Sequence, residues 1–177
     1  CLTLAEELQG NGHEVVFAAS ISGIQWLEEA MRVAGYPTVA VIADEIDTAA
    51  LAQLRPDWVV VDSYRIPAEE VSGLAIVDGS TRGIRAQLYL EQNLGAEAIE
   101  WDVPHGSMLA GAQYALIRDG FLAARRPDPS AVVAVPKVTA FMGGTDPSAI
   151  IVEVARQLGT VPEPVTLTIV APAAHTL

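Results

Sequence analysis

Short runs of almost uninterrupted apolar residues recur along this chain and alternate with stretches of helical periodicity. The run at 57–61 reads Asp-Trp-Val-Val-Val, and the run at 74–77 reads Leu-Ala-Ile-Val. Such runs are typical of strands that are buried on both faces. Strands of this kind that alternate with helices at short spacing predict βαβ crossovers, and hence a parallel sheet in a doubly wound α/β domain.

The same patterns place the individual elements. Helices are expected at 1–8, 24–33, 47–54, 67–72 and 148–158. Strands are expected at 13–19, 38–42, 57–61, 74–77, 88–90, 114–117, 137–142 and 165–170. Ser20 or Ser22 is the expected cap of the helix at 24–33, and Pro67 suits the first turn of the helix at 67–72.

A charged, proline-broken stretch at 125–129 (Arg-Arg-Pro-Asp-Pro) is the expected linker between two domains. It divides the chain into a Rossmann-like domain at 1–128 and the start of a second, nucleotide-binding domain at 129–177. The second part holds a single βαβ pattern, and the chain begins without an N-cap or an initiator Met. Both ends are therefore expected to be missing.

Composition narrows the possible partners. The formal net charge of −12 disfavours nucleic acid and anionic lipid, but backbone N–H groups can still bind a small phosphorylated substrate. A single cysteine fits the reducing cytoplasm, and no apolar run is long enough to span a bilayer. The three histidines lie far apart without metal-ligand spacing, so neither a metal nor a cofactor is expected.

Polar residues at the ends of predicted parallel strands are the first candidates for a site, because ligands bind at that edge. Asp62 and Tyr64 follow the strand at 57–61, and together they could orient a water or bind sugar hydroxyls. Alternatively, Asp62 caps the following turn. Asp78 follows the strand at 74–77 but could instead form a local pair with Arg82. Asn93 could bind a ligand or close a turn.

A loop between the strand at 137–142 and the next helix reads Gly-Gly-Thr-Asp-Pro at 143–147. Two glycines permit the close approach of a diphosphate, and the start of the next helix carries partial positive charge. The loop matches neither the dinucleotide fingerprint nor the P-loop. A Gly-Gly turn with an Asp or Thr N-cap explains it equally well without a ligand.

Several short motifs, taken in their order along the chain, together resemble those of one protein family. They are Gly12-His13-Glu14-Val15, Asp62-Ser63-Tyr64, Gln92-Asn93, the stretch from Gly111 through Tyr114-Ala115-Leu116-Ile117-Arg118 to Phe121, and Gly143-Gly144-Thr145-Asp146-Pro147. They resemble the UDP-sugar hydrolase of pseudaminic acid biosynthesis and the related spore-coat polysaccharide biosynthesis proteins. The resemblance covers essentially the whole chain and implies a two-domain GT-B fold.

The resemblance also implies a function and a set of site residues. Enzymes of the family release the nucleoside diphosphate from an aminodeoxy sugar without a metal. Tyr64 would lie near the reacting centre with Asp62 beside it. Asn93 and Arg118 would line or support the cleft, and Gly143, Gly144 and Thr145 would lie near the diphosphate. Asp78 and Asp146 are further candidates for substrate binding.

Two departures from the family pattern qualify the hypothesis. The family's catalytic histidine ends a Gly-x-Gly-His motif just before the position of Cys1, so this sequence does not contain it. Asp78-Gly79 stands where relatives tend to have paired acids. A nucleotide-sugar hydrolase is the leading hypothesis. A glycosyltransferase on the same scaffold and a non-catalytic sugar-nucleotide binding module are the alternatives.

Overall fold

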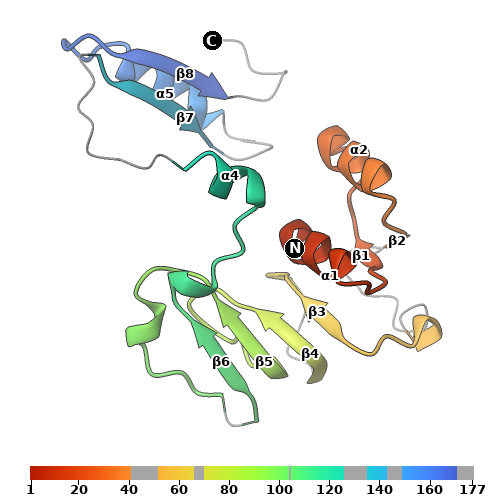
Figure 1. Ribbon diagram of the computed structural model, residues 1–177. Coiled ribbons are helices and arrows are strands. Elements are labelled where there is room, and N and C mark those ends of the chain that lie inside the picture. Colours follow the sequence, from red (N-terminus) through yellow and green to blue (C-terminus); the bar gives the residue numbers. More distant parts are fainter. Residues whose placement is uncertain (41–51, 66–69, 104, 126–134, 143–148, 171–177) are drawn as a thin grey trace. The chain divides into compact units, whose positions relative to one another are not determined.

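The computed structural model describes residues 1–40, 52–65, 70–103, 105–125, 135–142 and 149–170 (Figure 1). The chain divides into two compact units, Cys1–Arg125 and Arg126–Leu177.

The first unit is built on a four-stranded sheet whose strands all run in parallel (Figure 1). In sheet order they are β3 (Val59–Val61), β4 (Glu70–Ile76), β5 (Arg85–Glu91) and β6 (Ser107–Ala110). The predicted α/β class with a parallel sheet is confirmed. Parallel strands place all their carboxyl ends at one edge, and the candidate site lies at that edge.

Apolar side chains cover both faces of this sheet, which explains the uninterrupted apolar runs. Val61, Ala75 and Tyr89 belong to a cluster on one face, and Ala75 is completely buried. Leu74, Ile76 and Leu90 belong to a second cluster. Because successive residues of a strand point to opposite faces, neighbours such as Leu74 and Ala75 enter different clusters.

Helix α1 (Leu2–Gly10) contributes to both the main sheet and a smaller core. Its Leu4 packs against the cluster of Leu74, Ile76 and Leu90. Its Ala5 is buried instead with Met31 and Tyr36. Residues of α2 (Gln25–Ala34) and of strand β1 (Phe17–Ala19) complete this smaller core. Strand β1 pairs in parallel with β2 (Thr38–Ala40).

The predicted cap of α2 is wrong. Ile24 occupies the N-cap position and no side chain caps the helix, so Ser20 and Ser22 lie too far upstream to serve. The Glu28 side chain reaches back instead and accepts a 2.9 Å hydrogen bond from the Gly23 N–H. Gly35 follows the last residue of the helix in the left-handed conformation, with φ of 73°.

Two predicted elements of the first unit are also wrong. Residues 70–72 form the start of β4 rather than a helix, because Glu70 and Val71 pair with residues of β5 and the Val71 side chain is buried. The strand predicted at 114–117 is absent, and Ala112–Tyr114 is a 3-10 helix, η2. The strand that the pattern missed is β6, whose ladder with β5 forms in its place.

The connections between the strands differ from the predicted helical crossovers. Residues 77–84 join β4 to β5 as a loop without a helix, and the link from β5 to β6 carries only the short 3-10 helix η1 (Ala96–Ala98). After β6 come η2 and the short helix α4 (Asp119–Ala123). Of the helix predicted at 47–54, residues 52–54 are helical, and the others lie outside the described residues, as does Pro67.

The second unit contains one βαβ arrangement. Strands β7 (Lys137–Phe141) and β8 (Thr166–Val170) are parallel, and helix α5 (Ile150–Leu158) contacts both. Ile151 of α5 is fully buried. None of the described helices in either unit is long and apolar enough to cross a membrane.

Candidate functional site

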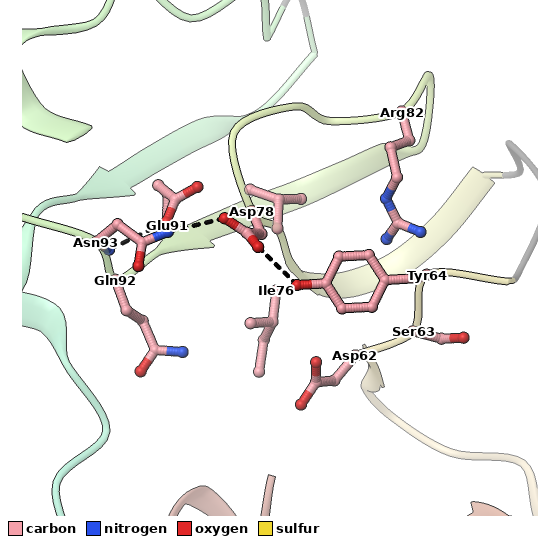
Figure 2. Close-up of a pocket in the computed structure, with 10 residues that line it drawn as sticks. Asp62, Ser63, Tyr64, Ile76, Asp78, Arg82, Glu91, Gln92 and Asn93 are labelled. Carbon is pink, nitrogen blue, oxygen red and sulfur yellow. Dashed lines mark hydrogen bonds between the residues drawn. The ribbon is translucent and has the colours of Figure 1, made fainter. Parts of the chain in front are cut away.

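A polar pocket of about 200 Å³ lies at the carboxyl edge of the main sheet, within the first unit (Figure 2). Its walls come from residues at or just after the ends of β3, β4 and β5. The lining residues are Asp62, Ser63, Tyr64, Ile76, Val77, Asp78, Arg82, Glu91, Gln92 and Asn93. Four of the residues predicted from the sequence, Asp62, Tyr64, Asp78 and Asn93, therefore share one pocket.

The Asp78 carboxylate joins the loops that follow three different strands. The Tyr64 hydroxyl donates a 2.7 Å hydrogen bond to its Oδ2, and Nδ2 of Asn93 donates a 2.8 Å bond to its Oδ1. Figure 2 shows Tyr64 and Asn93 pointing toward Asp78 from either side. Both carboxylate oxygens are thus engaged, and the local Asp78–Arg82 pair offered as an alternative does not form among the described residues.

The acidic surroundings of Tyr64 keep its phenol neutral. The pKa of Tyr64 is raised above its ordinary value of 10.0, first by the hydrogen bond to Asp78 and the charge of Asp78, then by partial desolvation and by Asp62. The Arg82 charge opposes this shift. Because the proton of Tyr64 is donated to Asp78, the phenol oxygen still has lone pairs with which to accept a hydrogen bond from a ligand or a water.

Arg82 lies against the ring of Tyr64, with its guanidinium carbon 5.4 Å from the ring centroid. Its backbone is in the left-handed region, with φ of 51°. Its Nη1 is buried, and within the described part of the chain it has no hydrogen-bond acceptor. Sequence reasoning treated Arg82 only as a partner of Asp78, because a ring contact with Tyr64 leaves no local signal.

Glu91 is the site residue that sequence reasoning missed. It is the last residue of β5, and only 2% of it is exposed. Its Oε2 accepts a 2.6 Å hydrogen bond from the Gly79 N–H, and its Oε1 accepts a 3.0 Å bond from the Asn93 N–H. A signal existed, since an acid directly ends the apolar run Leu-Tyr-Leu at 88–90.

Asp62 is exposed and lies beside the start of α1. Its Oδ2 is 3.0 Å from Sγ of Cys1, which donates to it. The turn after β3 is closed by Ser63, whose hydroxyl accepts a 3.2 Å hydrogen bond from the Arg65 N–H. Ser63 therefore supplies the turn-closing bond that the sequence offered as an alternative role for Asp62.

Arg118 does not line this pocket. Arg118 donates a 2.8 Å hydrogen bond to Glu6 of α1, and the two line a separate surface pocket with other α1 residues. Gln92, next to Asn93, accepts a 2.7 Å bond from the Leu116 N–H and so anchors the segment that leads to Arg118. The predicted substrate-binding residues Gly143, Gly144, Thr145 and Asp146 lie outside the described residues.

No group of three or more His, Cys, Asp or Glu side chains suited to a metal ion occurs within the described ranges. Comparison with protein-family models, curated proteins and solved structures finds no match for this chain. The geometry of the pocket is therefore the observation that bears most directly on function.

Proposed function

We propose that this chain is part of a nucleotide-sugar hydrolase that releases UDP from an aminodeoxy sugar, in surface or spore-coat polysaccharide biosynthesis. The hydrogen-bonded set of Tyr64, Asp78 and Asn93 at the carboxyl edge of a parallel sheet carries the proposal. The resemblance of the sequence motifs to the UDP-sugar hydrolase family supplies the reaction. Assignment to the GT-B fold is part of the same proposal.

The lining of the pocket suits a sugar. Carboxylates and amides such as those of Asp62, Gln92 and Asn93 can accept hydrogen bonds from hydroxyl groups, and the amides can also donate. Apolar Ile76 and the exposed ring of Tyr64 offer surface for C–H groups. This mixture of polar and apolar contacts is what a small polyhydroxylated ligand needs.

The charge of the pocket favours the sugar over the diphosphate. Three carboxylates (Asp62, Asp78 and Glu91) and one guanidinium (Arg82) line it. A surplus of negative charge repels a phosphate but stabilises positive charge that develops on a sugar ring. The loss of a leaving group from an anomeric carbon passes through such an oxocarbenium-like state. We therefore propose that the sugar binds here, and the family resemblance assigns the diphosphate to Gly143, Gly144 and Thr145.

In the proposed reaction a water attacks the anomeric carbon, the bond from that carbon to the diphosphate oxygen breaks, and UDP leaves. Neutral Tyr64 donates to Asp78 and accepts a hydrogen bond from the water or from a sugar hydroxyl. In the resembled family the catalytic histidine directly precedes the position of Cys1. Because Cys1 contacts Asp62, a histidine at that position would lie beside this pocket and could serve as the base.

A product assay on the full-length protein tests the proposal. UDP and free sugar are expected from a UDP-sugar without any added acceptor. Strict dependence on an acceptor would instead show a glycosyltransferase, and binding of UDP without turnover would show a binding module. The single cysteine is compatible with an enzyme of the cytoplasm, where we place it.

A variant pair tests the role of the pocket. Tyr64→Phe is expected to lower kcat by about a hundredfold while KM changes little, because loss of a group that positions the attacking water costs about that much. Tyr114→Phe is the matched control, since Tyr114 lies in η2 and does not line the pocket. Unchanged turnover in Tyr64→Phe would remove Tyr64 from the mechanism.

A further inference from the structure

Glu91 is the only charged residue among the described residues that is buried. Burial of a carboxylate is costly unless hydrogen bonds compensate it. Two backbone N–H groups provide such bonds to Glu91, at 2.6 Å and 3.0 Å. The mechanism proposed above uses only the negative charge of this side chain and no contact that it makes. Each of its oxygens accepts a hydrogen bond from a backbone N–H group.

The two N–H groups that Glu91 binds belong to the segments that hold Asp78 in place. Gly79 directly follows Asp78 in the loop after β4, and Asn93 is itself a hydrogen-bond donor to Asp78. The Glu91 carboxylate thus links the loop after β4 to the segment after β5. Asp78 therefore has Gly79 and Asn93, both bonded to Glu91, beside it, and it accepts a further hydrogen bond from the Tyr64 hydroxyl.

We propose that Glu91 is a positioning residue that fixes Asp78 and Asn93 in register, and through Asp78 fixes the hydroxyl of Tyr64. An ionised carboxylate suits this role because both of its oxygens only accept hydrogen bonds. A glutamine at this position would turn an NH₂ group toward one of the two N–H groups, and that contact would be lost. The catalytic consequence of this role rests on the proposed function, whereas its geometric consequence does not.

The geometric consequence is tested by NMR on the chain with ¹³Cζ-labelled tyrosine and ¹⁵N label. Tyr64→Phe identifies the Tyr64 resonance, and Asp78→Asn gives the position expected when its acceptor is changed. Glu91→Gln is expected to move the Tyr64 Cζ and Asn93 side-chain amide resonances in the direction that Asp78→Asn moves them. A folded Glu91→Gln protein with both resonances unchanged would overturn the proposal.

Glu70→Gln is the matched control. Glu70 lies at the other end of the sheet, at the start of β4, where its exposed carboxylate bonds to Arg85. The same chemical change there is expected to leave the Tyr64 and Asn93 resonances in place. If Glu91→Gln does not fold, scalar couplings across the hydrogen bonds from Gly79 and Asn93 to the Glu91 carboxylate are measured in the wild-type chain. Absence of both couplings would contradict the proposed link.

The catalytic consequence is tested in the full-length enzyme with a UDP-sugar. Glu91→Gln is expected to lower kcat by about tenfold to a hundredfold with little change in KM, because small displacements of catalytic groups have effects of that size. Added to Asp78→Ala, the same change is expected to have a smaller effect than in the wild-type enzyme, since Glu91 acts in part through Asp78. Full additivity of the two losses would overturn this part. If the wild-type enzyme shows no turnover, the proposed function fails, while the NMR result still decides the role of Glu91.

Discussion

The hydroxyl of Tyr64 lies 2.7 Å from Oδ2 of Asp78, although the two residues follow different strands of the sheet. Fourteen positions separate them in the sequence, and the parallel pairing of β3 with β4 brings them together. The contact fixes where the phenol proton lies and leaves the phenol oxygen as an acceptor.

Replacement of Asp78 by a neutral residue is expected to bring the pKa of Tyr64 closer to its ordinary value. Asp78→Asn removes the hydrogen-bonded negative charge that is the largest cause of the raised pKa of Tyr64. The pKa of Tyr64 should therefore fall toward 10.0. A pH titration of ¹³Cζ-labelled tyrosine measures it, with Tyr64→Phe for assignment. An unchanged titration would show that the contact with Asp78 does not exist in solution.

Loss of Arg82 is expected to shift the same pKa in the opposite direction. The guanidinium charge stabilises the phenolate and lowers the pKa of Tyr64. Arg82→Gln should therefore raise that pKa further above the wild-type value. Arg85→Gln is the control, because Arg85 bonds to Glu70 and does not line the pocket. A fall in the pKa of Tyr64 in Arg82→Gln would contradict the observed stacking.

The raised pKa of Tyr64 also predicts how stability changes with alkaline pH. In the folded state the neutral phenol is favoured, so the contribution of Tyr64 is fully present below its unfolded pKa, near 10.0. That contribution is lost as the pH rises through the higher folded pKa. Buried Tyr36, whose pKa is raised by burial and by Glu6, acts in the same direction.

Thermal unfolding of wild type and of Tyr64→Phe at several pH values between about 9 and 11 measures the Tyr64 effect. The difference in Tm between the two proteins is expected to become smaller as the pH increases. A difference that grows with pH for Tyr64→Phe would mean that the sign of the pKa shift is wrong.

Two buried tyrosines are expected to respond oppositely to loss of the hydroxyl. Tyr89 donates a 2.8 Å bond to the Ile84 carbonyl and accepts a 2.8 Å bond from the Ala86 N–H. Tyr89→Phe should therefore lower the free energy of unfolding by about 1–3 kcal/mol, because a buried N–H loses its partner. The Tyr36 hydroxyl is buried, and within the described part of the chain it has no partner.

Tyr36→Phe is therefore expected to be neutral or to stabilise the protein by up to about 1 kcal/mol, since the unpaired hydroxyl is removed and the ring remains. The edge-to-face contact of that ring with Phe17, at 5.1 Å between centroids, is retained. Urea unfolding of both variants makes the comparison. A larger loss for Tyr36→Phe than for Tyr89→Phe would contradict the observed hydrogen bonding.

Gly73 is the position in β4 where a side chain is least tolerable. Its φ is 149°, and a Cβ there would overlap the backbone carbonyl oxygen of Val59 in the neighbouring strand. Gly73→Ala is expected to cost about 3 kcal/mol or more, or to prevent folding. Gly10→Ala is the control, because that helical position is open and alanine favours helix by about 1 kcal/mol. Equal stability of the two variants would rule out the close approach of Gly73 to the Val59 carbonyl oxygen.

Local sequence was enough to place several residues of the pocket but not to choose their partners. Asp62, Tyr64, Asp78 and Asn93 all follow strands, and parallel strands end at one edge, so their convergence was predictable. Asp78 had a charged neighbour four positions away in Arg82, yet it bonds to Tyr64 and Asn93. Arg118 pairs with Glu6, 112 positions away, and no sequence pattern indicates that pair.

The sequence by itself determined the α/β class and the parallel sheet, because the spacing of apolar runs reports which faces of each element are buried. Only the tertiary structure decided that residues 70–72 extend a strand, since the gain comes from pairing with β5 and not from local preference. Only the tertiary structure gave Glu91 its place between Gly79 and Asn93. A chain pattern reports burial residue by residue, whereas the register between strands decides which buried groups meet.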